Sequence, residues 1–217
     1  MYLRPHAEVS ERVLLPGDPG RALRLAQQLV DTPKMLNHHR GLWGYVGPAA
    51  DGAPLTIQST GLGGPSTAIV VGELIALGAR RLVRVGTCTA DGLSLGSLVV
   101  VEAALAVDGA SRALGAEGAL PADPALLAGL RGATSAPAGV VRSVDLPGAT
   151  AGGAPAVDLS TAALFAAAAR GGVAAAAVLL VSRSGDRELE PEALERAEVE
   201  LGRVGATAVA GAGELRH

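Results

Sequence analysis

Several residue types are rare in this chain of 217 residues, and each scarcity excludes a class of protein. Cys88 is the single cysteine, so the chain can form neither an internal disulfide nor a metal site built on cysteine pairs. The aromatic residues are Tyr2, Trp43, Tyr45 and Phe165, too few for the surfaces on which proteins stack single-stranded nucleic acids. The formal net charge of −3 lacks the basic surplus of a nucleic-acid-binding protein. We therefore expect no nucleic-acid partner and no metal.

Long apolar stretches are also missing. The longest, Val173 to Val181, has nine residues, whereas a membrane-spanning helix needs about 20. Residues 1–10 contain no apolar stretch of the kind found in a secretory signal. We therefore expect a cytoplasmic protein with no membrane partner. The hydrophobic share of 49% is ample for a buried core, and the length predicts a single domain over residues 1–217.

Candidate strands and helices alternate along the chain. Strand patterns occur at residues 12–15, 42–46, 55–59, 81–85, 98–107, 139–144 and 173–181, and the second and third of these predict a hairpin. Helix patterns occur at residues 22–30, 67–77, 122–130, 159–170 and 190–209, and residues 149–155 are expected to form a loop. For the first helix, Asp18 is a candidate N-cap and Pro19 a candidate first helical residue. The alternation predicts an α/β protein with a central, largely buried sheet.

Glycine stands next to arginine or hydroxyl residues in three loops at strand ends, at residues 17–21, 61–66 and 84–87. Ligands of α/β proteins bind beyond the carboxyl ends of the strands. Glycine lets backbone N–H groups approach an oxyanion, and the side chains of Arg21, Arg84 and Thr87 can bind a phosphate directly. The alternative is that the glycines only form turns and the arginines lie in solvent. The first loop is not a Walker A loop, because the Gly-Lys-Ser/Thr ending is absent.

Four segments carry a family resemblance: VLLPGDPGRA (residues 13–22), HRGLWGYVG (39–47), STGLGGPSTAIVVGELIALGARRLVRVGT (59–87) and VDGAS (107–111). They resemble the nucleoside phosphorylase family, which contains the hexameric purine nucleoside phosphorylases and the uridine phosphorylases. The residues of these segments are closer to those of the uridine branch. The similarity is dense over residues 6–111 and patchy beyond. The resemblance implies a three-layer α/β/α fold with a central mixed sheet. It also implies phosphorolysis, in which inorganic phosphate cleaves a nucleoside into a free base and ribose or deoxyribose 1-phosphate.

The resemblance implies a complete set of phosphate-binding residues. Gly17, Arg21, Arg84 and Thr87 match the positions that one subunit contributes, and Arg40 matches an arginine contributed by a neighbouring subunit. The related nucleosidases, which use water, lack this arginine set. The match therefore favours phosphorolysis over hydrolysis, with inorganic phosphate as co-substrate and no further cofactor.

The resemblance also implies an oligomer. His6 matches an N-terminal histidine that reaches the ribose of a neighbouring subunit, although its spacing to Gly17 is shorter than the family pattern. The alternative for His6 is an exposed residue in the terminal segment. Because Arg40 and His6 complete a site only from a neighbour, we expect a homo-oligomer, a dimer at least and a hexamer by resemblance.

The candidate ribose site departs from the family pattern. Leu159 and Ser160 fall where family members have Met and the Glu that holds the ribose hydroxyls. A neutral hydroxyl binds a diol more weakly than a carboxylate does and cannot stabilise positive charge on the sugar. We assign both residues to the ribose site and expect reduced or altered activity.

The candidate base site also departs from the pattern. Arg183 stands where the purine enzymes have an Asp that protonates the base and where the uridine branch has an Arg. With Arg84 it is assigned as a catalytic residue, and with Cys88 and Thr89 as a base-binding residue. The Gln-x-Arg segment of the uridine branch is missing, which leaves both uridine-like and purine substrates open.

Three interpretations follow. The first is a nucleoside phosphorylase with altered or low activity, and the second is an enzyme of the same fold that acts on a different glycosylated molecule. The third is a non-catalytic protein that binds phosphate or another small molecule. The complete phosphate set favours the first, while Ser160 weighs against an efficient ribosyl enzyme.

Overall fold

The computed structural model describes residues 1–149 and 152–211, and within them eleven strands form one mixed sheet. The strands are β1 (Arg12–Leu15), β2 (Lys34–Asn37), β3 (Gly44–Pro48), β4 (Pro54–Gln58), β5 (Arg81–Thr89), β6 (Leu98–Ala106), β7 (Ala119–Pro121), β8 (Ala138–Ser143), β9 (Ala156–Asp158), β10 (Ala174–Ser184) and β11 (Arg187–Glu188). The helices are α1 (Pro19–Leu29), α2 (Gly63–Ala76), α3 (Gly109–Ala113), α4 (Pro124–Ala133), α5 (Thr161–Gly171) and α6 (Pro191–Gly211), with a short 3-10 helix at His39–Gly41.

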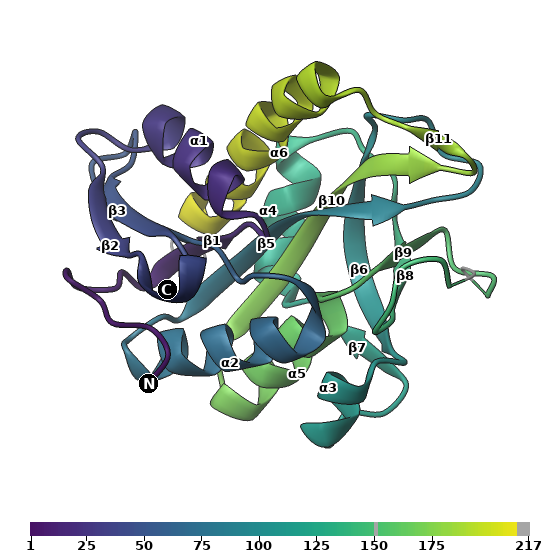
Figure 1. Ribbon diagram of the computed structural model, residues 1–217, viewed down its shortest axis with the longest axis horizontal. Coiled ribbons are helices and arrows are strands. Elements are labelled where there is room, and N and C mark those ends of the chain that lie inside the picture. The colour runs from purple at the N-terminus through teal and green to yellow at the C-terminus, as the bar shows by residue number, and fades with distance from the viewer. Residues whose placement is uncertain (150–151, 212–217) are drawn as a thin grey trace.

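The sheet has two differently built parts (Figure 1). In the first, β4, β1, β5 and β10 run parallel, and β3 and β2 continue from β4 as antiparallel strands. In the second part, β10 pairs with β6, β6 with β8, and β8 with β9. Strand β9 then pairs with β5 through Val157 and Thr89. Five strands therefore close into a ring, a feature that the expectation of a central mixed sheet did not include.

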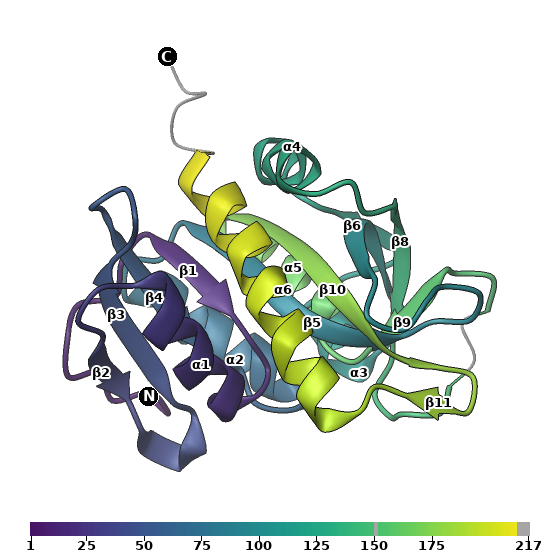
Figure 2. The same ribbon diagram turned by 90° about the horizontal axis from the view of Figure 1, so that it is seen from above.

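Helices cover both faces of the sheet. Helices α1, α4 and α6 pack together on one face, and α2, α3 and α5 pack together on the other (Figure 2). The expected α/β class and three-layer arrangement are therefore confirmed. No helix within residues 1–149 and 152–211 is long and apolar enough to cross a membrane.

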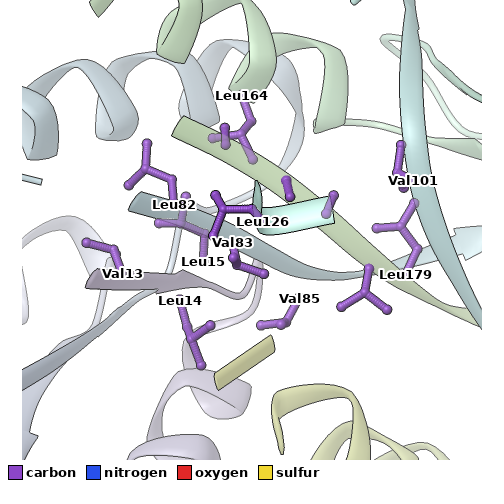
Figure 3. Close-up of a cluster of buried hydrophobic side chains, with 14 of the residues drawn as sticks. Val13, Leu14, Leu15, Leu82, Val83, Val85, Val101, Leu126, Leu164 and Leu179 are labelled. Atoms are coloured by element: carbon purple, nitrogen blue, oxygen red, sulfur yellow. The ribbon is translucent and has the colours of Figure 1, made fainter. Parts of the chain in front are cut away.

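The core lies between these layers. Every residue of β1 is buried, as expected for a parallel strand covered on both faces. Side chains from β1, β5, β6, β10 and the covering helices meet there (Figure 3), among them Val13, Leu14, Leu15, Leu82, Val83, Val85, Val101, Leu126, Leu164 and Leu179, all fully buried.

The expected elements are present, with two kinds of difference. The strand expected to end at Val85 continues to Thr89, because residues 85–88 stay paired with residues 178–181 of β10. The short elements β2, β7, β9, β11 and α3 were not predicted, since so few residues show no hydrophobic period. Residues 150 and 151 of the expected loop at 149–155 lie outside the described residues.

A glycine of α6 allows that helix to touch the sheet, which gives a stability test. A Cβ at Gly205 would lie 2.5 Å from Cγ1 of Val85 and 3.2 Å from Cδ2 of Leu14. We expect Gly205→Ala to lower the free energy of unfolding by about 1–2 kcal/mol, because overpacking outweighs the gain in helix propensity. The control is Gly72→Ala in α2, where a Cβ meets nothing within 4 Å and should add roughly 0.5–1 kcal/mol. Urea unfolding measures both, and changes of the same sign would contradict the close packing.

Candidate active site

Two glycine-containing loops lie against each other at the carboxyl ends of β1 and β4. The N–H of Gly61 donates to the carbonyl of Gly17 at 3.0 Å, and the N–H of Thr60 donates to that of Pro16 at 2.9 Å. Gly61 has a φ of +74°, and a Cβ there would lie 2.6 Å from Oγ of Ser66. Glycine is therefore required at this turn, and the two loops form one continuous wall.

A cavity of about 960 Å³ opens beside this wall. It lies where the carboxyl ends of β1, β5 and β10 meet, the place at which α/β proteins bind ligands. Nine of the predicted site residues line it: Gly17, Arg21, Arg84, Thr87, Cys88, Thr89, Leu159, Ser160 and Arg183. The structure thus brings together, in one cavity, residues spread over most of the chain.

Arg21 is held in the first turn of α1. Asp18 caps this helix by accepting the backbone N–H of Arg21 at 2.6 Å, with proline at the start of the helix, as the sequence predicts. The Arg21 side chain is 7% exposed, and its Nη2 lies 2.7 Å from Oε1 of the buried Glu198. A second, longer bond of 3.4 Å joins Nη1 to the carbonyl of Val85, while Nε has no partner in the part of the chain that the structure describes.

Arg84 occupies the middle of β5 and folds back over its own strand. A Cβ at Gly86 would lie 2.7 Å from the guanidinium carbon of Arg84, so only glycine leaves room for this conformation. The Arg84 side chain is 7% exposed, and its Nε donates to Oδ2 of Asp158 at 3.3 Å. Burial and the charge of Arg21 lower its pKa, and the Asp158 carboxylate opposes that shift. Among the described residues, Nη1 of Arg84 is buried without a partner, as Nε of Arg21 is.

Asp158 is the carboxylate that anchors Arg84. Its Oδ1 accepts the hydroxyl of Ser143 at 2.5 Å, and its Oδ2 accepts that of Thr161 at 2.6 Å. The backbone N–H groups of Ser160 and Thr161 also donate to it, at 3.2 and 3.0 Å. Because all these donors converge on it, Asp158 has little capacity left for a ligand. Ser160, two residues further along the chain, also lines the cavity and is almost fully buried.

The far end of the cavity is polar and open to solvent. Arg183 lies there with its side chain 48% exposed and pairs with Glu188 across the β10–β11 hairpin at 2.8 Å. Thr89 and the acids Asp91 and Asp186 complete this end. The exposed pair is worth little in stability, so Arg183 can exchange Glu188 for a ligand at small cost.

Cys88 is part of the cavity wall but is almost fully buried. Burial raises the pKa of its thiol to about 12, and the nearby Asp158 carboxylate acts in the same direction. The thiol is therefore protonated near neutral pH, and the side chain contributes shape to the wall rather than a nucleophile.

Two predicted site residues lie away from this cavity. His6 is exposed and stacks on His38, with ring centroids 5.3 Å apart. Arg40 is also exposed, and its guanidinium lies 5.3 Å from the ring centre of Tyr2. Its backbone has a φ of 59°. Neither side chain lines the cavity of the same subunit. The contribution of His6 and Arg40 to the site of a neighbouring subunit stays a prediction.

Sequence reasoning missed Glu198, the carboxylate that holds Arg21. The sequence did carry a signal for it. Glu198 falls between Leu194 and Leu201 on the apolar stripe of the terminal helix, and its side chain is 3% exposed. An acid at such a position must be paired to remain charged, and its partner proves to be the candidate phosphate-binding arginine.

Comparison with known proteins agrees with this geometry. The Phosphorylase superfamily matches residues 11–210. The crystal structure of a uridine phosphorylase from Vibrio fischeri is similar, with a TM-score of 0.83 and 28% identity, over 93% of this chain and 92% of that one.

Two curated relatives match over shorter stretches. A DeoD-type purine nucleoside phosphorylase of Oceanobacillus iheyensis is 44% identical over 84 residues, which are 38% of this chain and 35% of that protein. A uridine phosphorylase of Haemophilus influenzae is 42% identical over 100 residues, 45% of this chain and 39% of that protein. The matches thus span little more than a third of these relatives. The family match, by contrast, covers nearly the whole chain, and the chain belongs to the phosphorylase superfamily.

Proposed function

We propose that this protein cleaves nucleosides by phosphorolysis. The observation that carries the proposal is the pair of buried guanidinium groups at one end of the cavity, each with an N–H that has no partner within residues 1–149 and 152–211. A buried donor without a partner costs about 1–3 kcal/mol, and because both side chains line the cavity, we expect a phosphate bound there to accept hydrogen bonds from Arg21 and Arg84. Membership of the phosphorylase superfamily supports the same reaction.

In the proposed reaction a phosphate oxygen attacks C1′ of the pentose, a C–O bond forms, and the C1′–N bond breaks with its electron pair on the base. Gly17, Arg21, Arg84 and Thr87 bind the phosphate and hold it on the face opposite the base, which removes much of the entropic cost of attack. The sugar becomes oxocarbenium-like in the transition state, and the bound phosphate is both nucleophile and counter-charge. Phosphate is then the only co-substrate that the reaction requires.

Sugar and base occupy the rest of the cavity in this proposal. Leu159 and Ser160 contact the pentose, and the neutral Ser160 predicts lower activity than a carboxylate would give. Arg183, with Cys88 and Thr89, contacts the base. By releasing Glu188, Arg183 can neutralise the charge that develops on a leaving uracil-type base, which favours a uridine-like substrate over a purine.

We further propose that the active form is a homo-oligomer, at least a dimer and by family resemblance a hexamer. Arg40 and His6 are exposed and lie outside the cavity of their own subunit. In a symmetric dimer each could reach the neighbour's cavity, where Arg40 would add a third guanidinium for the phosphate dianion.

The proposal is tested by measuring base release from uridine, thymidine, inosine and adenosine, with and without inorganic phosphate. We expect phosphate-dependent release, with the pyrimidine nucleosides preferred by roughly tenfold or more because Arg183 cannot protonate a purine. Equal release without phosphate would indicate hydrolysis instead. No release from any of the four, with phosphate still raising the melting temperature, would favour the non-catalytic binding protein.

A further inference from the structure

Glu198 lies in the middle of α6 and does not line the cavity, yet it contacts the phosphate end of the site. Its Oε1 lies 2.7 Å from Nη2 of Arg21, and its Oε2 lies 2.5 Å from Nη2 of Arg24. The Glu198 side chain is 3% exposed, and that of Arg21 is 7% exposed. One buried carboxylate therefore holds two arginines of α1.

The packing of α6 on α1 fixes this contact. Gly202 follows Glu198 by one helical turn, and a Cβ there would lie 2.2 Å from Cδ2 of Leu25. Leu25 in turn follows Arg21 by one turn of α1. Because residues four apart lie on one face of a helix, the close Gly202–Leu25 approach sets Glu198 directly against Arg21.

We propose that Glu198 is a positioning residue for the phosphate site: it fixes the Arg21 guanidinium on the cavity wall in the orientation that binds phosphate. This inference rests on the proposed function. Apart from Glu198, the side chain of Arg21 has only the long bond to the Val85 carbonyl among the described residues. A flexible arginine loses rotamer freedom when it binds an anion, and an anchored one has already lost it.

The sharing of Glu198 also preserves the charge that phosphate needs. A carboxylate paired with Arg21 alone would cancel its positive charge. Since Arg24 takes the second oxygen, Glu198 and its two arginines together carry a net charge of +1, and the other partner of Arg24, Glu195, is 59% exposed, so solvent screens its charge. The geometry therefore combines a fixed guanidinium with a residual positive potential.

The test is the binding of inorganic phosphate to the full chain by calorimetry, without any nucleoside. We expect Glu198→Gln to raise the phosphate Kd about tenfold, and to raise KM for phosphate with KM for nucleoside unchanged. The control is Glu195→Gln on the same helix. The Glu195 side chain is 59% exposed and, among the described residues, pairs with Arg24 alone, at 3.4 Å, so the phosphate Kd should not change.

Two results would overturn the proposal. An unchanged phosphate Kd with a lower melting temperature would make Glu198 purely structural, and a lower Kd would mean that the carboxylate merely competes with phosphate for Arg21. If Glu198→Gln does not fold, Glu198→Asp decides, because it keeps the charge and withdraws it by one methylene. A raised Kd supports positioning, and a wild-type Kd contradicts it.

Failure of this inference is distinguishable from failure of the proposed function. If the unmodified chain binds no phosphate, phosphorolysis itself is excluded and Glu198 has nothing to position. If the unmodified chain binds phosphate while both Glu198 variants bind it equally well, phosphorolysis stands and only the role of Glu198 falls.

Discussion

Replacing Arg84 by methionine is expected to lower kcat/KM for phosphorolysis by roughly 100- to 1000-fold, the loss typical when one charge-stabilising donor is removed. The side chain of Arg84 is buried at the proposed phosphate end of the cavity, and its Nη1 has no partner among the described residues. Methionine retains much of the side-chain volume and removes every donor. The loss should appear both as a higher KM for phosphate and as a lower kcat, because in the proposed mechanism Arg84 binds phosphate in the ground state and in the transition state.

Steady-state kinetics at varied phosphate concentrations measure this effect. The matched control is Arg80→Met. Arg80 is exposed, and its side chain bonds only the backbone carbonyls of Ile75 and Ala79 among the described residues. Its replacement should leave kcat/KM unchanged. A loss below about tenfold for Arg84→Met, in a variant that remains folded, would remove Arg84 from the catalytic machinery.

The fold was largely predictable because its signals are local. Alternating apolar runs and turn residues predicted the strands of the parallel part and the longer helices, and Asp18 with Pro19 predicted the start of α1. The closing of the sheet was not predictable. It depends on the pairing of Thr89 with Val157, residues far apart in sequence, and on a three-residue strand without any period of its own.

The candidate site was predictable where glycine and arginine stand together in short motifs. Arg21, Arg84 and Thr87 proved to line one cavity, as the glycine loops indicated. What the motifs could not give is how the arginines are held. Their carboxylate partners, Glu198 and Asp158, come from distant segments and are fixed only by the packing of α6 and by the ring of strands.

Asp158→Asn is expected to lower the free energy of unfolding by about 3–5 kcal/mol, since it removes one partner of a buried ion pair. The groups around Asp158 are all donors: the guanidinium of Arg84, the hydroxyls of Ser143 and Thr161, and two backbone N–H groups. An asparagine amide would direct its own N–H₂ at some of them. It would also leave the charge of Arg84 uncompensated in a buried site.

Chemical denaturation measures this loss, and Glu102→Gln is the control. Glu102 pairs with Arg131, but the two side chains are 39% and 51% exposed, so the change should cost less than about 1 kcal/mol. The decisive variant is the double mutant with Arg84→Met, which removes both buried charges. If Asp158 stabilises the fold through its ion pair with Arg84, the double mutant loses less unfolding free energy than the sum of the two single losses, with a coupling of roughly 1–3 kcal/mol. Strict additivity would instead mean that Asp158 serves only to fix the start of α5, and that Arg84 keeps its orientation through Gly86 and the strand alone.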